Sequence, residues 1–252
     1  MRDSYKNQLD TLHTELIRMG ALCEDAIACA VKGLIDEDES VRDKASRIER
    51  EINQKEREIE DFCLRLLIRE QPVARDLRQI SAALKMITDM ERIGDQAEDI
   101  AEISTFMIGS QIKSDVHITE MANATVKMLK DSVDSFVEGD IEKAREVITY
   151  DDVVDDLFIK IKGELVCKIT QNNAQGSSCL DLLMTAKYLE RIGDHAVNIA
   201  EQVEFMVSNE IGSRTAGTTA GKVADDAAGK VAGEVTGDMA GADSSDGEVE
   251  GV

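Results

Sequence analysis

The sequence ERIGDQAEDIAE at residues 91–102 returns as ERIGDHAVNIAE at residues 190–201, with nine of the twelve positions identical. The two copies lie 99 residues apart. A weaker register at 102 residues relates the segments before them, and it pairs Val31 with Val133, Leu34 with Phe136, and Asp38 with Asp140. The difference of three residues fits a changed loop around Pro72. The repeats therefore predict a duplicated unit, with domains at residues 1–110 and 111–211.

Apolar residues recur at spacings of three and four along residues 4–211, which is typical of amphipathic helices. In the first segment they are Leu9, Leu12, Leu16, Met19, Leu22, Cys23 and Ala26. A single proline and only 3% aromatic residues favour long helices over a β fold. Polar and turn-like breaks predict six helices, at residues 4–35, 39–70, 73–108, 112–137, 140–171 and 177–210. We expect an all-α fold in which each unit forms an elongated three-helix bundle.

The last 41 residues, 212–252, differ in composition from the rest of the chain. They hold nine of the 17 glycines and contain no aromatic residue, no leucine and no isoleucine. Such a segment cannot bury enough apolar surface to offset the entropy of ordering it. We therefore expect a disordered tail rich in glycine, alanine and aspartate.

The charge balance limits the classes of partner, because 51 acidic and 29 basic residues give a net charge of −22. This argues against nucleic-acid binding and suits cations or cationic partners. No apolar run is long enough to span a membrane, and the polar N-terminal segment does not resemble a secretory signal, so we expect a cytoplasmic protein. The cysteines show no Cys-x-x-Cys pair and are expected as reduced core residues: Cys23, Cys29, Cys63, Cys167 and Cys179.

Acidic residues follow one face of each helix that carries the motif, on the side away from its apolar residues. In the first copy the face spans an arc of about 80° and contains Glu91, Asp95, Asp99 and Glu102. In the second copy the equivalent residues are Glu190, Asp194, Asn198 and Glu201. The helix before each motif carries a matching set, which is Glu49 and Asn53 in the first unit and Asp151 and Asp155 in the second.

Carboxylates one turn apart supply both charge and oxygen ligands for divalent cations. A solvated acidic face is the competing interpretation, and the residues alone leave both open. Gly94 and Gly193 occupy the same place in both copies; since glycine destabilises a helix, they indicate close approach of a neighbouring helix or shared descent. His195 has Gln96 as its counterpart, so we expect a surface histidine.

The doubled motif resembles the PhoU family of phosphate-signalling regulators, in the forms MERIGDQAEDIAE at 90–102 and LERIGDHAVNIAE at 189–201. The segment REQPVARDLR at 69–78 is similar to the link between that family's second and third helices. The resemblance implies two three-helix bundles with metal motifs on adjacent helices. The implied ligands are Glu49, Asn53, Glu91 and Asp95 in one unit and Asp151, Asp155, Glu190 and Asp194 in the other, with Asp99, Glu102, Asn198 and Glu201 as further candidates.

The resemblance leaves the metal open between iron, zinc, manganese and magnesium. Asn53 stands where the family pattern has an acid, which removes one negative charge and predicts a weaker or differently occupied first site. The acidic tail lies outside the family pattern.

The resemblance also implies a negative regulator of phosphate uptake. It would bind the ATPase or permease of the phosphate-specific ABC transporter, with a sensor histidine kinase as a second partner. It would be a cytoplasmic homodimer that reaches the membrane only through its partners. The sequence contains no P-loop, G-x-S-x-G motif or Cys–His pairing, so we expect no catalytic residue.

Two alternatives remain from the residues themselves. A carboxylate-bridged di-iron enzyme would bury its ligands in a four-helix core, usually with two Glu-x-x-His motifs, which this sequence lacks. A metal-free helical adaptor would instead dock its acidic faces onto basic partner surfaces.

Overall fold

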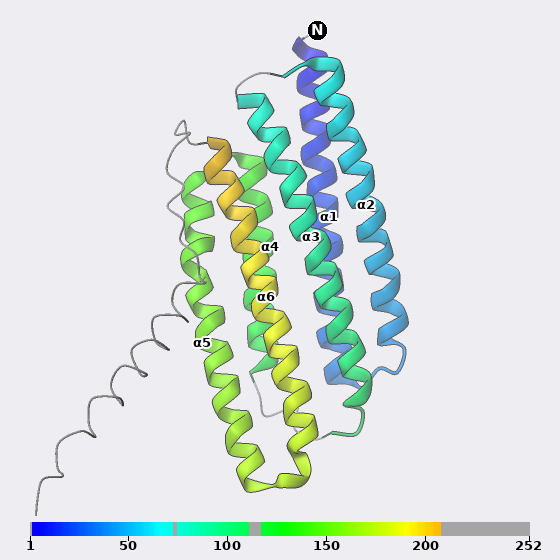
Figure 1. Ribbon diagram of the computed structural model, residues 1–252, viewed down its shortest axis with the longest axis vertical. Helices are drawn as coiled ribbons and strands as arrows, with labels where there is room; N and C mark the ends of the chain where they lie inside the picture. The colour runs from blue at the N-terminus through cyan, green and yellow to red at the C-terminus, as the bar shows by residue number, and fades with distance from the viewer. Residues whose placement is uncertain (1, 73–74, 111–116, 208–252) are drawn as a thin grey trace, which may run out of the picture. The chain divides into compact units, whose positions relative to one another are not determined.

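A computed structural model describes residues 2–72, 75–110 and 117–207. Within these residues the chain forms α-helices joined by turns, one 3₁₀ turn and no strand (Figure 1). The elements are α1 (Arg2–Asp36), α2 (Val41–Glu70), α3 (Arg75–Phe106), α4 (Ile118–Glu138), α5 (Ile141–Gln171), η2 (Asn173–Gln175) and α6 (Gly176–Val207). The predicted all-α fold with six helices is confirmed.

The helix boundaries differ modestly from those predicted. The fourth helix is observed from Ile118, and residues 112–116 of the predicted segment lie outside the described residues. The sixth begins at Gly176, so the serines expected to cap it lie in its first turn. The predicted tail at 212–252 also lies outside the described residues.

The two repeats pack against each other through their third helices. The helices α1 to α6 belong to one compact unit, in which α3 contacts α6 and α1 contacts α4. Figure 1 shows α3 and α6 running antiparallel at the centre, with α2 beside α3 and α5 beside α6. The division into separate domains at 1–110 and 111–211 stays a prediction.

The core of the unit is aliphatic and follows the predicted periodicity. On α1 the fully buried side chains include Leu12, Leu16, Met19, Cys23 and Ile27. Each buried aliphatic side chain contributes roughly 1.5–3 kcal/mol relative to exposure, so packing of these stripes is the main source of stability. All five cysteines are free; Cys23, Cys63 and Cys179 are buried as expected, Cys29 is half-buried, and Cys167 is exposed.

Short turns join α1 to α2 and α4 to α5. Gly139 ends α4 with a φ of +67°, in the left-handed region that favours glycine. Asp140 then caps α5, because its Oδ1 accepts hydrogen bonds from the backbone N–H groups of Glu142 and Lys143. At the equivalent turn of the first repeat, Oδ1 of Asp38 accepts from the backbone N–H and the hydroxyl of Ser40. These turns join α1 to α2 and α4 to α5 at equivalent places of the two repeats.

Candidate functional site

The first carboxylate cluster, formed by Glu49 and Asn53 on α2 and by Glu91 and Asp95 on α3, lies between these two helices. Burial raises the pKa of Glu91, and the charges of Asp95, Glu56 and Glu49 raise it further. The pKa of Glu49 is raised first by burial and then by Glu98 and Asp95. Carboxylates on α2 thus raise a pKa on α3, and carboxylates on α3 raise a pKa on α2. The structure therefore brings the predicted residues together in one cluster.

Asn53 takes a specific position in the first cluster. Its Nδ2 donates a hydrogen bond to Oε1 of Glu49, one helical turn away. Its Oδ1 is buried and has no hydrogen-bond partner among the described residues. A buried acceptor without a donor is unfavourable, so this oxygen is available to a cation or a donor that enters the cluster.

The motif glycines allow α2 to approach α3 and α5 to approach α6. A Cβ atom at Gly94 would lie 2.8 Å from Cδ1 of Ile52. A Cβ atom at Gly193 would lie 3.3 Å from Oδ1 of Asp151 and 3.5 Å from Cγ1 of Val154. The predicted close approach is thus confirmed at both positions, and at Gly193 the neighbour includes a cluster carboxylate.

The second carboxylate cluster consists of Asp151 and Asp155 on α5 and of Glu190 and Asp194 on α6. Burial raises the pKa of Asp151 to about 6, with further increases from Asp155, Asp194 and Glu190. Burial likewise raises the pKa of Asp194, and the charge of Glu190 adds to it. Four carboxylates repel one another here, and a bound positive charge would relieve that repulsion.

One cation already lies in the second cluster, and the sequence reasoning missed it. Lys187 on α6 forms an ion pair with Glu190, three residues further along the helix. Its positive charge also opposes the increase in the pKa of Asp155 and of Asp194. The spacing of three residues between Lys187 and Glu190 was the available signal in the sequence.

The donor chemistry of both clusters fits a hard or borderline divalent cation. Carboxylate and amide oxygens are the preferred ligands of such ions, and the unpartnered Oδ1 of Asn53 is an oxygen of this kind. In the part of the chain that the structure describes, no three Asp, Glu, His or Cys side chains are placed to hold a metal ion together. Holding an ion would therefore require rotation of these side chains.

The further candidate ligands lie in other contacts. Asp99 accepts a hydrogen bond from Tyr188 on α6, and burial raises the pKa of Asp99. Glu102 forms an ion pair with Arg42 at 2.9 Å. Nδ2 of Asn198 donates to Oδ1 of Asp89 at 3.1 Å. Glu201 is exposed.

His195 is not the surface histidine that the sequence suggested. Its side chain is 13% exposed, and its Nδ1 lies 2.9 Å from Oδ1 of Asp89 on α3. The contact joins the two repeats. The sequence did not indicate Asp89, because this residue precedes the motif and its equivalent in the second copy is Tyr188, which is not acidic.

The contacts of Asp89 and Tyr188 are equivalent by the internal repeat. The offset of 99 residues relates Asp89 to Tyr188 and Asp99 to Asn198. The Asp89–Asn198 hydrogen bond on one side therefore corresponds to the Tyr188–Asp99 hydrogen bond on the other. Two versions of one polar contact thus fix α3 against α6.

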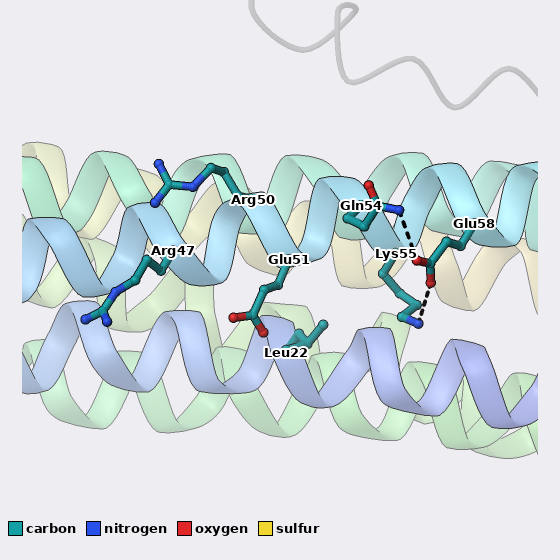
Figure 2. Close-up of a pocket in the computed structure, with 7 residues that line it drawn as sticks. All are labelled: Leu22, Arg47, Arg50, Glu51, Gln54, Lys55 and Glu58. Carbon is teal, nitrogen blue, oxygen red and sulfur yellow. Dashed lines mark hydrogen bonds and ion pairs between the residues drawn. The ribbon is translucent and has the colours of Figure 1, made fainter.

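A groove of about 450 Å³ lies apart from the predicted residues, between α1 and α2 (Figure 2). Its lining consists of Leu22, Arg47, Arg50, Glu51, Gln54, Lys55 and Glu58. Lys55 forms ion pairs with Glu58 at 2.7 Å and with Glu15 at 2.9 Å. In Figure 2 the side chains of Arg47 and Arg50 point apart. The groove thus carries charges of both signs, of which Lys55 and Glu58 pair with each other, and its arginines do not converge on a ligand.

Among the helices described, none contains a stretch long and apolar enough to cross a lipid bilayer.

Comparison with known families gives two matches within this chain. Residues 16–104 and 118–203 each match the family model described as the PhoU domain. Together the matches cover both motifs and the helices that carry the two clusters. They agree with the duplication predicted from the repeats.

Curated relatives match over most of the chain. A phosphate-specific transport system accessory protein PhoU homolog from Clostridium acetobutylicum is 35% identical over 211 residues, which cover 83% of this chain and 96% of the relative. A homolog of the same description from Pseudomonas aeruginosa is 35% identical over 205 residues, covering 81% and 85%.

Solved structures share the fold. The crystal structure of PhoU from Pseudomonas aeruginosa has a TM-score of 0.74 and 33% identity, and covers 81% of this chain and 98% of that one. The regulatory protein PhoU of the phosphate transport system from Streptococcus pneumoniae has a TM-score of 0.75 at 22% identity, covering 82% and 99%, and this likeness concerns the fold alone.

Proposed function

The chain belongs to the PhoU family, and on that premise we propose that it regulates phosphate uptake as an accessory protein of a phosphate-specific ABC transporter. It would bind the ATPase or permease and restrain uptake when phosphate is plentiful. The observation that supports this most directly is the PhoU domain matched twice, over residues 16–104 and 118–203. A sensor histidine kinase is a second proposed partner, through which the protein would damp the starvation response.

The proposed mode of action is binding rather than catalysis. The curated relatives are named as accessory proteins, which supports a regulatory role. The acidic clusters lie between helices with Asp95, Asp155 and Asp194 exposed, whereas a di-iron enzyme would enclose its ligands in the core. We propose that the protein works at the cytoplasmic face of the membrane, as a homodimer, through contacts with its partners.

We propose further that both carboxylate clusters bind a divalent or multinuclear metal, drawn from iron, zinc, manganese and magnesium. Glu49, Asn53, Glu91 and Asp95 would hold the first. Asp151, Asp155, Glu190 and Asp194 would hold the second. A bound metal would supply positive charge that neutralises the carboxylates and would link α2 to α3 and α5 to α6.

Affinity capture tests the regulatory role. The full chain would be used as bait with solubilised membranes of the source organism, grown at high and at low phosphate. We expect to recover the transporter's ATPase or permease in amounts that depend on phosphate. Recovery of no transporter component in either condition would contradict the proposal. A Glu39→Ala, Asp61→Ala bait is the control for unspecific charge effects, because both residues are exposed and lie outside the clusters.

The metal-free adaptor is the second candidate, and the same experiment distinguishes it. Acidic faces attract basic partner surfaces without an ion in between. Capture by wild type that persists unchanged after exhaustive chelation would favour the adaptor. Capture that is lost on chelation and restored by one divalent ion would favour metal-dependent docking.

A further inference from the structure

Lys187 lies in the second carboxylate cluster as a positive charge fixed to α6. It forms an ion pair with Glu190, whose side chain is only 17% exposed. Its ammonium also lies 5.6 Å from the ring centroid of Phe158 on α5, which adds a cation–π contact. The lysine therefore bridges from α6 toward α5 across the cluster.

The first cluster has no lysine at the equivalent position, although the charges of Arg92 and Arg50 oppose the increases in the pKa of Glu91 and Glu49. The offset of 99 residues places Thr88 at the equivalent position, and its hydroxyl donates to the backbone oxygen of Leu84 at 3.4 Å. The first cluster instead has Asn53 where the second has Asp155, at the offset of 102 residues. At these two pairs of equivalent positions, the second cluster has an added ammonium and the first cluster has one carboxylate fewer.

The formal charges of the two clusters come out equal. Three carboxylates in the first cluster, Glu49, Glu91 and Asp95, give −3. Four carboxylates and one ammonium in the second also give −3, from Asp151, Asp155, Glu190, Asp194 and Lys187. The two clusters differ in how this charge arises. The ammonium of Lys187 is on a flexible side chain and can move out of the second cluster, whereas the neutral amide of Asn53 cannot regain a charge.

We propose that Lys187 is a tethered counter-cation of the second cluster, which a divalent ion must displace from Glu190 in order to bind. The inference rests on the proposed metal binding. In the absence of metal the ammonium holds α5 and α6 together. In the presence of metal it swings outward, and the cluster then offers four carboxylates. The second site would be selective for ions that bind strongly enough to break the ion pair, while the first site has Thr88 in place of the competing lysine.

The test uses Mn²⁺ alone as the probe and the full chain with the first cluster disabled by Glu91→Gln and Asp95→Asn. Free Mn²⁺ is measured by electron paramagnetic resonance during titration. We expect Lys187→Met to bind Mn²⁺ roughly three- to tenfold more tightly, because a partly exposed ion pair of about 1 kcal/mol no longer competes. Lys187→Arg keeps the charge and should bind like the parent. Lys32→Met, which removes a charge from the exposed face of α1, should also leave the affinity unchanged.

A second readout does not depend on metal affinity. Without metal, Lys187→Met should melt at a lower temperature than its parent, and saturating Mn²⁺ should remove that difference. If the parent binds Mn²⁺ and Lys187→Met binds it no more tightly, the proposed role of Lys187 is overturned and the proposed metal binding is not. Failure of the wild type and every variant to bind Mn²⁺ would overturn metal binding and the competition together.

The converse variant checks the same idea at the other cluster. Thr88→Lys places an ammonium at the position equivalent to Lys187, in a chain whose second cluster is disabled by Glu190→Gln and Asp194→Asn. We expect it to bind Mn²⁺ more weakly than the Thr88 parent. Thr88→Met, which adds similar length without charge, is the matched control. Unchanged affinity in Thr88→Lys would count against competition by a tethered ammonium.

Discussion

Asp89 on α3 lies 2.9 Å from Nδ1 of His195 on α6, and the same carboxylate oxygen accepts a hydrogen bond from Asn198 at 3.1 Å. The side chains of Asp89 and His195 are 14% and 13% exposed. The contact joins the two repeats, and it connects the second motif to a residue just outside the first. It therefore links the helices of both carboxylate clusters to one another.

Removing Asp89 should weaken this junction. We expect Asp89→Ala to lower the free energy of unfolding by about 1–3 kcal/mol, because it leaves His195 and Asn198 without their partner. Tyr188→Phe, at the equivalent contact, should cost roughly 0.5–1.5 kcal/mol for one hydrogen bond. Urea unfolding followed by circular dichroism would measure both. Asp61→Asn on the exposed face of α2 is the control, and a loss as large as that of Asp89→Ala would contradict the interpretation.

Two glycines outside the motif should respond in opposite directions to alanine. A Cβ atom at Gly163 in α5 would have no neighbouring atom within 4 Å, so Gly163→Ala should stabilise the protein by about 1 kcal/mol through helix propensity. A Cβ at Gly33 would lie 2.5 Å from Cβ of Val41, so Gly33→Ala should destabilise it by roughly 1–3 kcal/mol. Thermal melts of both variants would decide this. Stabilisation by Gly33→Ala would show that the α1–α2 turn can shift without strain.

The raised pKa of Asp151 predicts a pH dependence of stability in the absence of metal. Its ordinary value is 3.8 and its folded value is about 6. Between these values the folded state keeps a proton that the unfolded state has released, so the free energy of unfolding falls as pH rises through this window. Above this pH window, the decrease in the free energy of unfolding has reached its full size.

Asp151→Asn should therefore be more stable than wild type at neutral pH, and less sensitive to pH between about 4 and 6. Melting temperatures measured with a chelator across this range would test it. Asp61→Asn, which removes an exposed acid on α2 outside both clusters, is the control. Parallel curves for wild type and Asp151→Asn would refute the prediction.

Loss of the second cluster should change metal content and leave the fold intact. We expect Glu190→Ala with Asp194→Ala to lower the bound metal, since two of four carboxylates are removed. Helical content should stay the same, because the packing of α6 rests on buried residues such as Leu189, Ile192 and Ala196. Elemental analysis and circular dichroism measure the two quantities. A large loss of helicity would contradict the position of these acids outside the core.

Helix periodicity and the repeat were sufficient to predict the helices and the faces that carry the acids. Gly94 and Gly193 indicated either close approach of a neighbouring helix or shared descent, and the structure shows close neighbours at both positions. The acidic faces of adjacent helices also predicted that Glu91 and Glu49 share one cluster, and their raised pKa values agree with that. All of these predictions concern contacts within one repeat.

Contacts between the repeats could not be predicted in the same way. Periodicity tells which side of α6 is polar, and it does not tell that α3 runs antiparallel beside that side. Asn198 and Asp99 were therefore assigned to the acidic stripe, although they bond to Asp89 and Tyr188 of the other repeat. His195 was assigned to the surface for the same reason.

The equivalence of the Asp89–Asn198 and Tyr188–Asp99 contacts gives the single chain the geometry of an isologous dimer. In a dimer of identical three-helix subunits, every substitution would appear on both sides of the axis. Covalent fusion removes that constraint, because each half can then change alone. A symmetric dimer of identical subunits could not hold the differences between the two repeats, which are Lys187 in place of Thr88 and Asp155 in place of Asn53. Fusion is thus the step that allows two clusters of common origin to acquire different side chains.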